Sequence, residues 1–62
     1  MRTTLNLLTR NGAVYMDFRP ALNGAQYTRL LEIANECDTE EELRNAVTEW
    51  AKEERLKVSF EE

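Results

Sequence analysis

The sequence has no histidine, a single cysteine (Cys37), a single proline (Pro20) and only two glycines. A lone cysteine rules out a disulfide within the chain. Without histidine or paired cysteines at ligand spacing, the chain also lacks the donor set of a structural zinc site. Nucleophilic catalysis usually needs a base within reach of the nucleophile, and no histidine serves Cys37 or Ser59. We therefore predict a non-enzymatic protein with no catalytic residues, no metal and no cofactor.

Long apolar runs are also absent from the 62 residues. No stretch approaches the ~20 apolar residues of a membrane span, and residues 1–12 lack the apolar core of a signal peptide. We expect a cytoplasmic protein with a reduced thiol and no membrane partner. Residues 1–62 make a single domain, and a chain this short buries only ~60% of its unfolded surface. Self-association is one remaining source of stability, and a homodimer and a monomer stay open as equal alternatives.

Charge is distributed unevenly along a chain whose net charge is −4. Residues 1–31 carry +3, because four arginines accompany the single acid Asp17, whereas residues 32–62 carry −7. An acidic protein is poorly suited to wrapping duplex DNA, although one small basic face remains compatible with this balance. The asymmetry therefore concerns partners and solubility more than fold.

An Asn11–Gly12 pair separates two segments in which apolar and polar residues alternate. Asn-Gly suits a type I′ turn, whose two central residues need positive φ. A turn centred there predicts a β-hairpin in which Leu8 faces Tyr15, and Pro20 ends the second strand because it cannot continue a central ladder. One face of this hairpin then carries the apolar residues Leu5, Leu7, Val14, Met16 and Phe18, and a slip by one residue would scatter them.

A first helix is predicted to begin after Asn23, which can act as its N-cap with Gln26 reaching back in a capping box. Cys37, at the junction that follows this helix, is expected to be an ordinary packing thiol rather than a reactive one. The predicted apolar stripe of the helix consists of Tyr27, Leu30, Leu31 and Ala34, with Ile33 and Cys37 at its border.

The segment CDTEEE at residues 37–42 is predicted to end the first helix and to start a second one, with Thr39 and Glu42 as another capping box. The neighbouring acids Glu40 and Glu41 suit the positive end of a helix dipole and need no catalytic role. Trp50 continues the apolar stripe of this helix, so we expect it in the core rather than in a binding site. The stripe consists of Leu43, Ala46, Val47 and Trp50, with Ala51 beside it.

The segment LKVSF at residues 56–60 alternates again and predicts a third strand. The chain order β-β-α-α-β defines an α+β fold with two layers, in which a helical hairpin packs on one face of a three-stranded sheet. The third strand can pair antiparallel with the second strand or parallel with the first, and the sequence leaves both open. The predicted core face of the sheet carries Leu5, Leu7, Val14, Met16, Phe18, Leu56, Val58 and Phe60.

The opposite, open face of the sheet is the predicted binding surface. It combines apolar and basic side chains, and the residues predicted to bind a partner are Leu8, Arg10, Tyr15, Arg19 and Lys57. The remaining residues of this face are Arg2, Thr4, Asn6, Ala13, Asp17 and Ser59, with Glu61 just beyond. A protein partner, or a second copy of the chain, would dock on the apolar centre. A single-stranded nucleic acid would stack a nucleobase on Tyr15 and place its phosphates against the basic side chains of this face. A plain solvated face is the third alternative, and we favour a protein-binding adaptor or regulatory domain.

Residues 14–51 loosely resemble a ribbon-helix-helix repressor. The segment VYMDFRP is similar to the strand of that family, and NGAQYTRLLEIANECDTEEELRNAVTEWA is similar to its two helices. The resemblance implies a strand that pairs between two chains and enters the DNA major groove, with Tyr15, Asp17 and Arg19 as readers. The predicted third strand has no counterpart in the basic fold of that family. Nucleic-acid binding is therefore kept as the alternative function.

Overall fold

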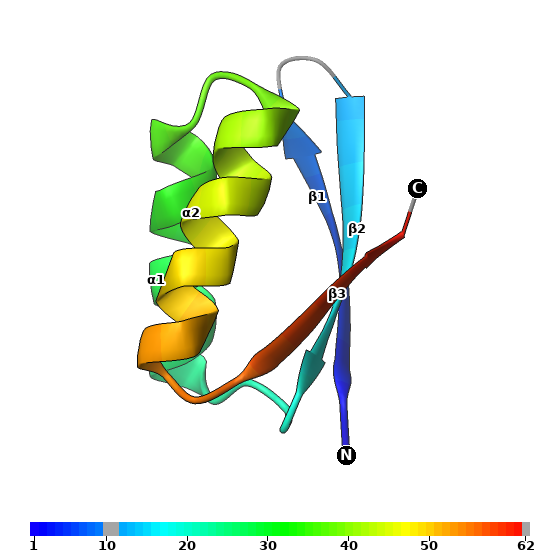
Figure 1. Cartoon of the computed structure of the whole chain (residues 1–62), viewed down its shortest axis with the longest axis vertical. Coiled ribbons are helices and arrows are strands. Elements are labelled where there is room, and N and C mark those ends of the chain that lie inside the picture. The colour runs from blue at the N-terminus through cyan, green and yellow to red at the C-terminus, as the bar shows by residue number, and fades with distance from the viewer. Residues whose placement is uncertain (10–11, 62) are drawn as a thin grey trace.

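A computed structural model describes residues 1–9 and 12–61 of the chain (Figure 1). Three strands form one antiparallel sheet in the order β1-β2-β3, and two helices lie side by side on one of its faces (Figure 1). The elements are β1 (Thr3–Thr9), β2 (Gly12–Arg19), α1 (Gly24–Glu36), α2 (Glu40–Glu53) and β3 (Lys57–Glu61). The predicted α+β fold is confirmed, and of the two open pairings for the third strand the structure has the antiparallel one with β2.

The end of α2 directs the chain into β3. Arg55 has a φ of 59°, and its N–H donates to the carbonyl of Lys52 at 3.2 Å, while the N–H of Leu56 donates to the carbonyl of Ala51 at 2.8 Å. This pair of bonds is a Schellman motif, which satisfies the last carbonyls of a helix and reverses the chain. Leu56 is buried directly after the turn, so β3 starts against the core.

The register of the β1–β2 hairpin differs from the prediction. Thr9 pairs with Gly12 and Leu8 pairs with Ala13, so the predicted pairing of Leu8 with Tyr15 is wrong. Of the predicted turn centre, Asn11 lies outside the described residues, and Gly12, with a φ of +142°, is a paired residue of β2 instead. Strand pairing thus begins earlier on β2 than a turn centred on Gly12 allows. Each residue of β1 meets a partner two positions earlier than predicted, and a shift of two keeps every side chain on its predicted face.

The central strand β2 contributes Val14, Met16 and Phe18 to the buried core. Phe18 and Trp50 meet edge to face, with ring centroids 6.0 Å apart and planes at 77°. Trp50 is 8% exposed, which confirms the prediction that it belongs to the core. The buried residues are Val14, Met16, Phe18, Leu30, Ile33, Leu43, Val47, Trp50, Ala51 and Leu56, and Leu5, Leu7, Val58 and Phe60 pack against them half-buried.

Helix α1 begins as predicted but buries a different stripe. Asn23 and Gln26 form the full capping box, with bonds of 2.8 and 3.0 Å between each side chain and the other residue's N–H. Ile33, predicted at the border, is buried, whereas Tyr27 and Leu31 remain 41% and 39% exposed. The physical reason is the position of α1 at one side of the helical layer, where only part of its apolar arc has sheet or α2 beside it.

Helix α2 begins with half of the predicted capping box. The hydroxyl of Thr39 accepts a hydrogen bond from the Glu42 N–H at 3.1 Å. The carboxylate of Glu42 accepts from the N–H of Asp38 at 3.4 Å rather than from that of Thr39. The reciprocal bond is therefore displaced by one residue into the tight connection between the helices, where Asp38 precedes the cap.

Candidate functional site

The open face of the sheet presents the predicted binding residues to solvent. Leu8 is 81% exposed and Tyr15 is 37% exposed, while Arg19 and Lys57 are also exposed. Arg10, predicted to belong to this face, lies outside the described residues. Figure 1 shows both helices on the other side of the sheet, so no element of the described chain covers this face.

The two large apolar residues of this face, Leu8 and Tyr15, occupy diagonal positions on neighbouring strands rather than directly opposed ones. Leu8 lies opposite Ala13, and Tyr15 lies between Asn6 of β1 and Glu61 of β3 in the register of the sheet. Diagonal neighbours on an antiparallel sheet are about 7–8 Å apart, which an aromatic side chain can reach. Leu8, Ala13 and Tyr15 therefore make up a small apolar patch at the hairpin end of the open face.

Asp17 occupies the middle of the open face and is already engaged. Its Oδ1 accepts a hydrogen bond from the Thr4 hydroxyl at 2.6 Å, and its Oδ2 lies 3.9 Å from the Arg2 guanidinium. Arg2 thus offsets the charge of Asp17 and is less available to an anionic ligand. Of the bases predicted for this face, Arg19 and Lys57 are the described ones without such a neighbour.

Arg19 and Lys57 lie directly opposite each other on β2 and β3. Neither side chain forms an ion pair with a residue in the described part of the chain. Like charges at directly opposed positions of a sheet destabilise the pairing. The fold thus keeps two cations opposite each other at the end of the open face away from the apolar patch. A bound carboxylate or phosphate would offset the repulsion between them.

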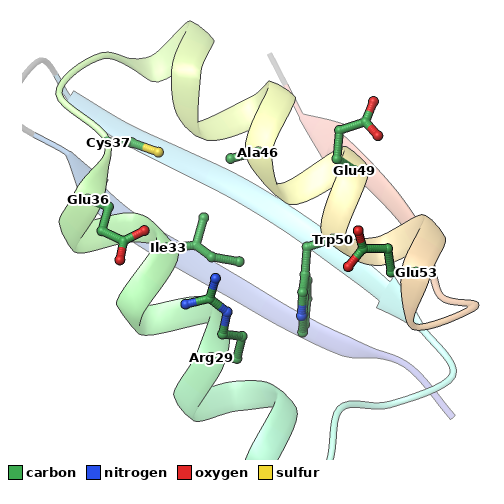
Figure 2. A pocket seen from close by; sticks show the side chains of 8 residues that line it. All are labelled: Arg29, Ile33, Glu36, Cys37, Ala46, Glu49, Trp50 and Glu53. Carbon is green, nitrogen blue, oxygen red and sulfur yellow. The ribbon is translucent and has the colours of Figure 1, made fainter.

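A groove between α1 and α2 is a second surface, which the sequence reasoning missed (Figure 2). It holds about 260 Å³. The side chains of Ile33 from α1 and Trp50 from α2 both extend into the space between the two helices (Figure 2). Its charged lining is acidic on balance, so it suits a cationic or apolar side chain. The lining residues are Arg29, Ile33, Glu36, Cys37, Ala46, Glu49, Trp50 and Glu53. The spacing of Ala46, Glu49, Trp50 and Glu53 on one side of α2 is the signal that could have indicated it.

Cys37 lies at one end of this groove (Figure 2). Burial, followed by the negative charges of Glu42, Glu36 and Asp38, raises the pKa of its thiol. A raised pKa keeps the sulfur protonated near neutral pH, and the thiolate is the nucleophilic form. The environment therefore makes Cys37 a poor nucleophile. Within residues 1–9 and 12–61, no cluster of three or more metal-binding side chains occurs.

Comparisons with known proteins add no relative. No family model, no curated protein and no solved structure matches this chain. The structure also departs from the ribbon-helix-helix arrangement, because β2 has a strand of its own chain on both edges and its backbone is not available to a second chain. In the described part of the chain, no helix is both long and apolar enough to cross a membrane.

Proposed function

We propose that this protein is a small non-catalytic adaptor or regulatory domain that binds another protein through the open face of its sheet. The observation that carries the proposal is the exposure of Leu8, an 81% exposed leucine diagonal to Tyr15 on the open face of the sheet. Exposed apolar patches on small domains commonly mark interaction surfaces, and tyrosine is enriched at the centres of such interfaces. The lone free thiol is in keeping with a cytoplasmic setting, where thiols stay reduced.

The partner would carry carboxylates beside an apolar side chain. Its apolar group would cover Leu8 and Tyr15, and its carboxylates would meet Arg19 and Lys57 at the other end of the face. Because these two cations repel each other, a carboxylate between them relieves a cost that the free domain bears. Charge complementarity of this kind mainly raises the association rate and selects the partner.

The alternative function is binding of single-stranded nucleic acid on the same face. The observation in its favour is the combination of an exposed tyrosine with the Arg19–Lys57 cation pair on a sheet. Such platforms usually bind single strands by stacking nucleobases on aromatic side chains and by placing arginine or lysine side chains against the phosphates. The Arg2–Asp17 pair in the middle of the face lowers its positive charge, so we rank this function second.

The experiment compares wild type with Leu8→Ser, Tyr15→Ser and with the matched control Tyr27→Ser, Leu31→Ser. Both double variants lose one leucine and one tyrosine from exposed positions, but the control changes α1 instead of the sheet. Each immobilised protein is exposed to native lysate, and the retained proteins are identified by mass spectrometry and retested in purified form. We expect proteins that bind wild type and the control but not the open-face variant. Equal retention by all three contradicts the proposal.

Salt dependence separates the two functions. Affinity for single-stranded oligonucleotides, measured by fluorescence anisotropy, falls steeply with ionic strength when phosphates are the contact. We expect no oligonucleotide binding by wild type even at low salt. Tight binding with a steep salt slope, lost in the open-face variant, would establish the nucleic-acid function instead.

A further inference from the structure

Strand β1 forms an edge of the sheet that lacks the usual protection. Its seven residues, Thr3–Thr9, contain no charged residue, proline or glycine. Within the described residues, no strand pairs with its outer edge, since the sheet ends there. Natural proteins normally blunt such an edge with short strands, charges or proline, because its free N–H and C=O groups can pair with another chain.

The opposite edge of the sheet is protected by comparison. Strand β3 has five residues and includes Lys57 and Glu61. Above it, the Arg44 guanidinium of α2 lies 5.5 Å from the centre of the Phe60 ring and also pairs with Glu40 at 2.7 Å. The paired Arg44 side chain therefore covers Phe60 at the β3 edge of the core, and this contrast singles out β1 as the edge available for pairing.

Apolar side chains of α1 flank the β1 edge. Figure 2 shows α1 on the β1 side of the sheet and α2 on the β3 side. Successive helix residues turn by about 100°. Arg29 and Ile33 line the groove toward α2, which places Tyr27 and Leu31 on the other side of the buried Leu30, facing away from α2. These two exposed residues therefore lie on the side of α1 that is nearest the β1 edge. Leu5 and Leu7 of that edge are only half-buried.

We propose that β1 pairs antiparallel with β1 of a second copy of this chain, with Asn6 opposite Asn6 at a twofold axis. The odd positions of β1 read Thr, Leu, Leu, Thr in either direction. This register therefore sets Leu5 opposite Leu7 of the other copy and Thr3 opposite Thr9. The two sheets join into one of six strands, and the two α1 helices meet through Tyr27 and Leu31.

A second copy fits this edge better than an unrelated strand, because one sequence supplies both halves of a self-complementary, uncharged contact. In a twofold interface the same patch supplies both halves, so that residue i faces residue j of the other copy and j faces i. A patch with charges of one sign would repel its copy, and the absence of charge from Thr3–Thr9 favours pairing. The chain has an accessible surface of 4427 Å². A contact of ~10% of that surface per copy is small for a stable interface, so we expect a dissociable dimer of micromolar or weaker affinity. The open faces stay exposed in this dimer, so its test is independent of the proposed function.

Sedimentation equilibrium over a concentration series tests the dimer. Wild type is expected to move from 7.3 kDa toward twice that mass as concentration rises to about 1 mM. Tyr27→Lys, Leu31→Lys places charges across the twofold axis and is expected to weaken dimerisation at least about tenfold. The control Tyr15→Lys, on the open face of the central strand, is expected to dimerise like wild type. A wild type that stays monomeric, or equal effects of the two changes, overturns the proposal.

Disulfide trapping tests the register without weakening the interface. In a Cys37→Ser background, Asn6→Cys brings two thiols to directly opposed positions, where Cβ atoms lie about 4.5–5.5 Å apart. The control Thr4→Cys on the same face leaves its thiols about 14 Å apart along the strands. Under mild oxidation we expect a covalent dimer from Asn6→Cys at least about tenfold faster than from Thr4→Cys. Equal rates, or no trapping of either, overturn this pairing.

Discussion

Truncation of Trp50 to alanine should remove most of the stability of this domain. Trp50 is 8% exposed, meets Phe18 edge to face at 6.0 Å and separates the core from the groove between the helices. Large-to-small changes of a buried aromatic residue cost about 3–5 kcal/mol, because burial and packing are both lost. A domain of 62 residues has a free energy of unfolding of roughly 3–9 kcal/mol. The loss is therefore a large part of the whole, and we expect Trp50→Ala to unfold at a much lower urea concentration than wild type.

Urea unfolding followed by circular dichroism measures this loss, with Trp50→Phe as the control. Phenylalanine keeps a ring against Phe18, so Trp50→Phe should be intermediate between wild type and Trp50→Ala. The fluorescence of the single tryptophan gives an independent check, since its emission should be blue-shifted and poorly quenched by iodide in the folded state. A red-shifted, fully quenched emission, or a cost below about 1 kcal/mol for Trp50→Ala, would refute the placement of Trp50 in the core.

Three further perturbations test local features of the chain. Arg55 holds a φ of 59°, so Arg55→Gly should raise the free energy of unfolding by about 0.5–1 kcal/mol, and a lower urea midpoint would contradict the strain. Gly12 has a φ of +142° with open space where a Cβ would lie, so Gly12→Val should cost more than about 1 kcal/mol from backbone strain alone, and an unchanged midpoint would contradict it. The pKa of the Cys37 thiol is raised in the folded chain, so folding favours the protonated thiol. This contribution to the free energy of unfolding is complete below the ordinary thiol pKa of 9.0, and it is lost as pH rises through the higher pKa of the folded chain. Iodoacetamide should accordingly label folded Cys37 more slowly at pH 8 than the same thiol in urea, and equal rates would contradict the burial.

The faces of the sheet could be predicted because they depend only on alternation within each strand. Leu5 and Phe18 are on the predicted face although their strands pair two positions away from the predicted register, since a shift of two does not exchange the faces. The turn residues alone did not settle the register, which depends on where pairing with β2 starts. The strand that pairs with β3 was also left open by the sequence, because the number of chain reversals allows β3 to pair with either β1 or β2.

The sides of the helices were harder to predict, because they depend on neighbours that the local sequence does not reveal. Tyr27 and Leu31 fit an apolar stripe at helical spacing, yet α1 lies at the side of its layer and leaves them exposed. The groove between the helices also depends on how α1 packs beside α2. Trp50 was correctly predicted to be buried, whereas its second role as a wall of that groove became visible only in the folded chain.

The central claim is that the open face of the sheet binds an acidic protein surface, and Lys57→Glu tests it most directly. The change places a carboxylate opposite Arg19 and so replaces two opposed cations with a pair of opposite charges, which should add about 0.2–1 kcal/mol to the free energy of unfolding. The matched control is Lys52→Glu on α2, which changes the net charge equally away from the sheet. The measurement is the affinity of a purified partner for the two variants. We predict that Lys57→Glu loses the partner while remaining at least as stable as wild type, and that Lys52→Glu retains it. Equal affinity of both variants for the partner would contradict the claim.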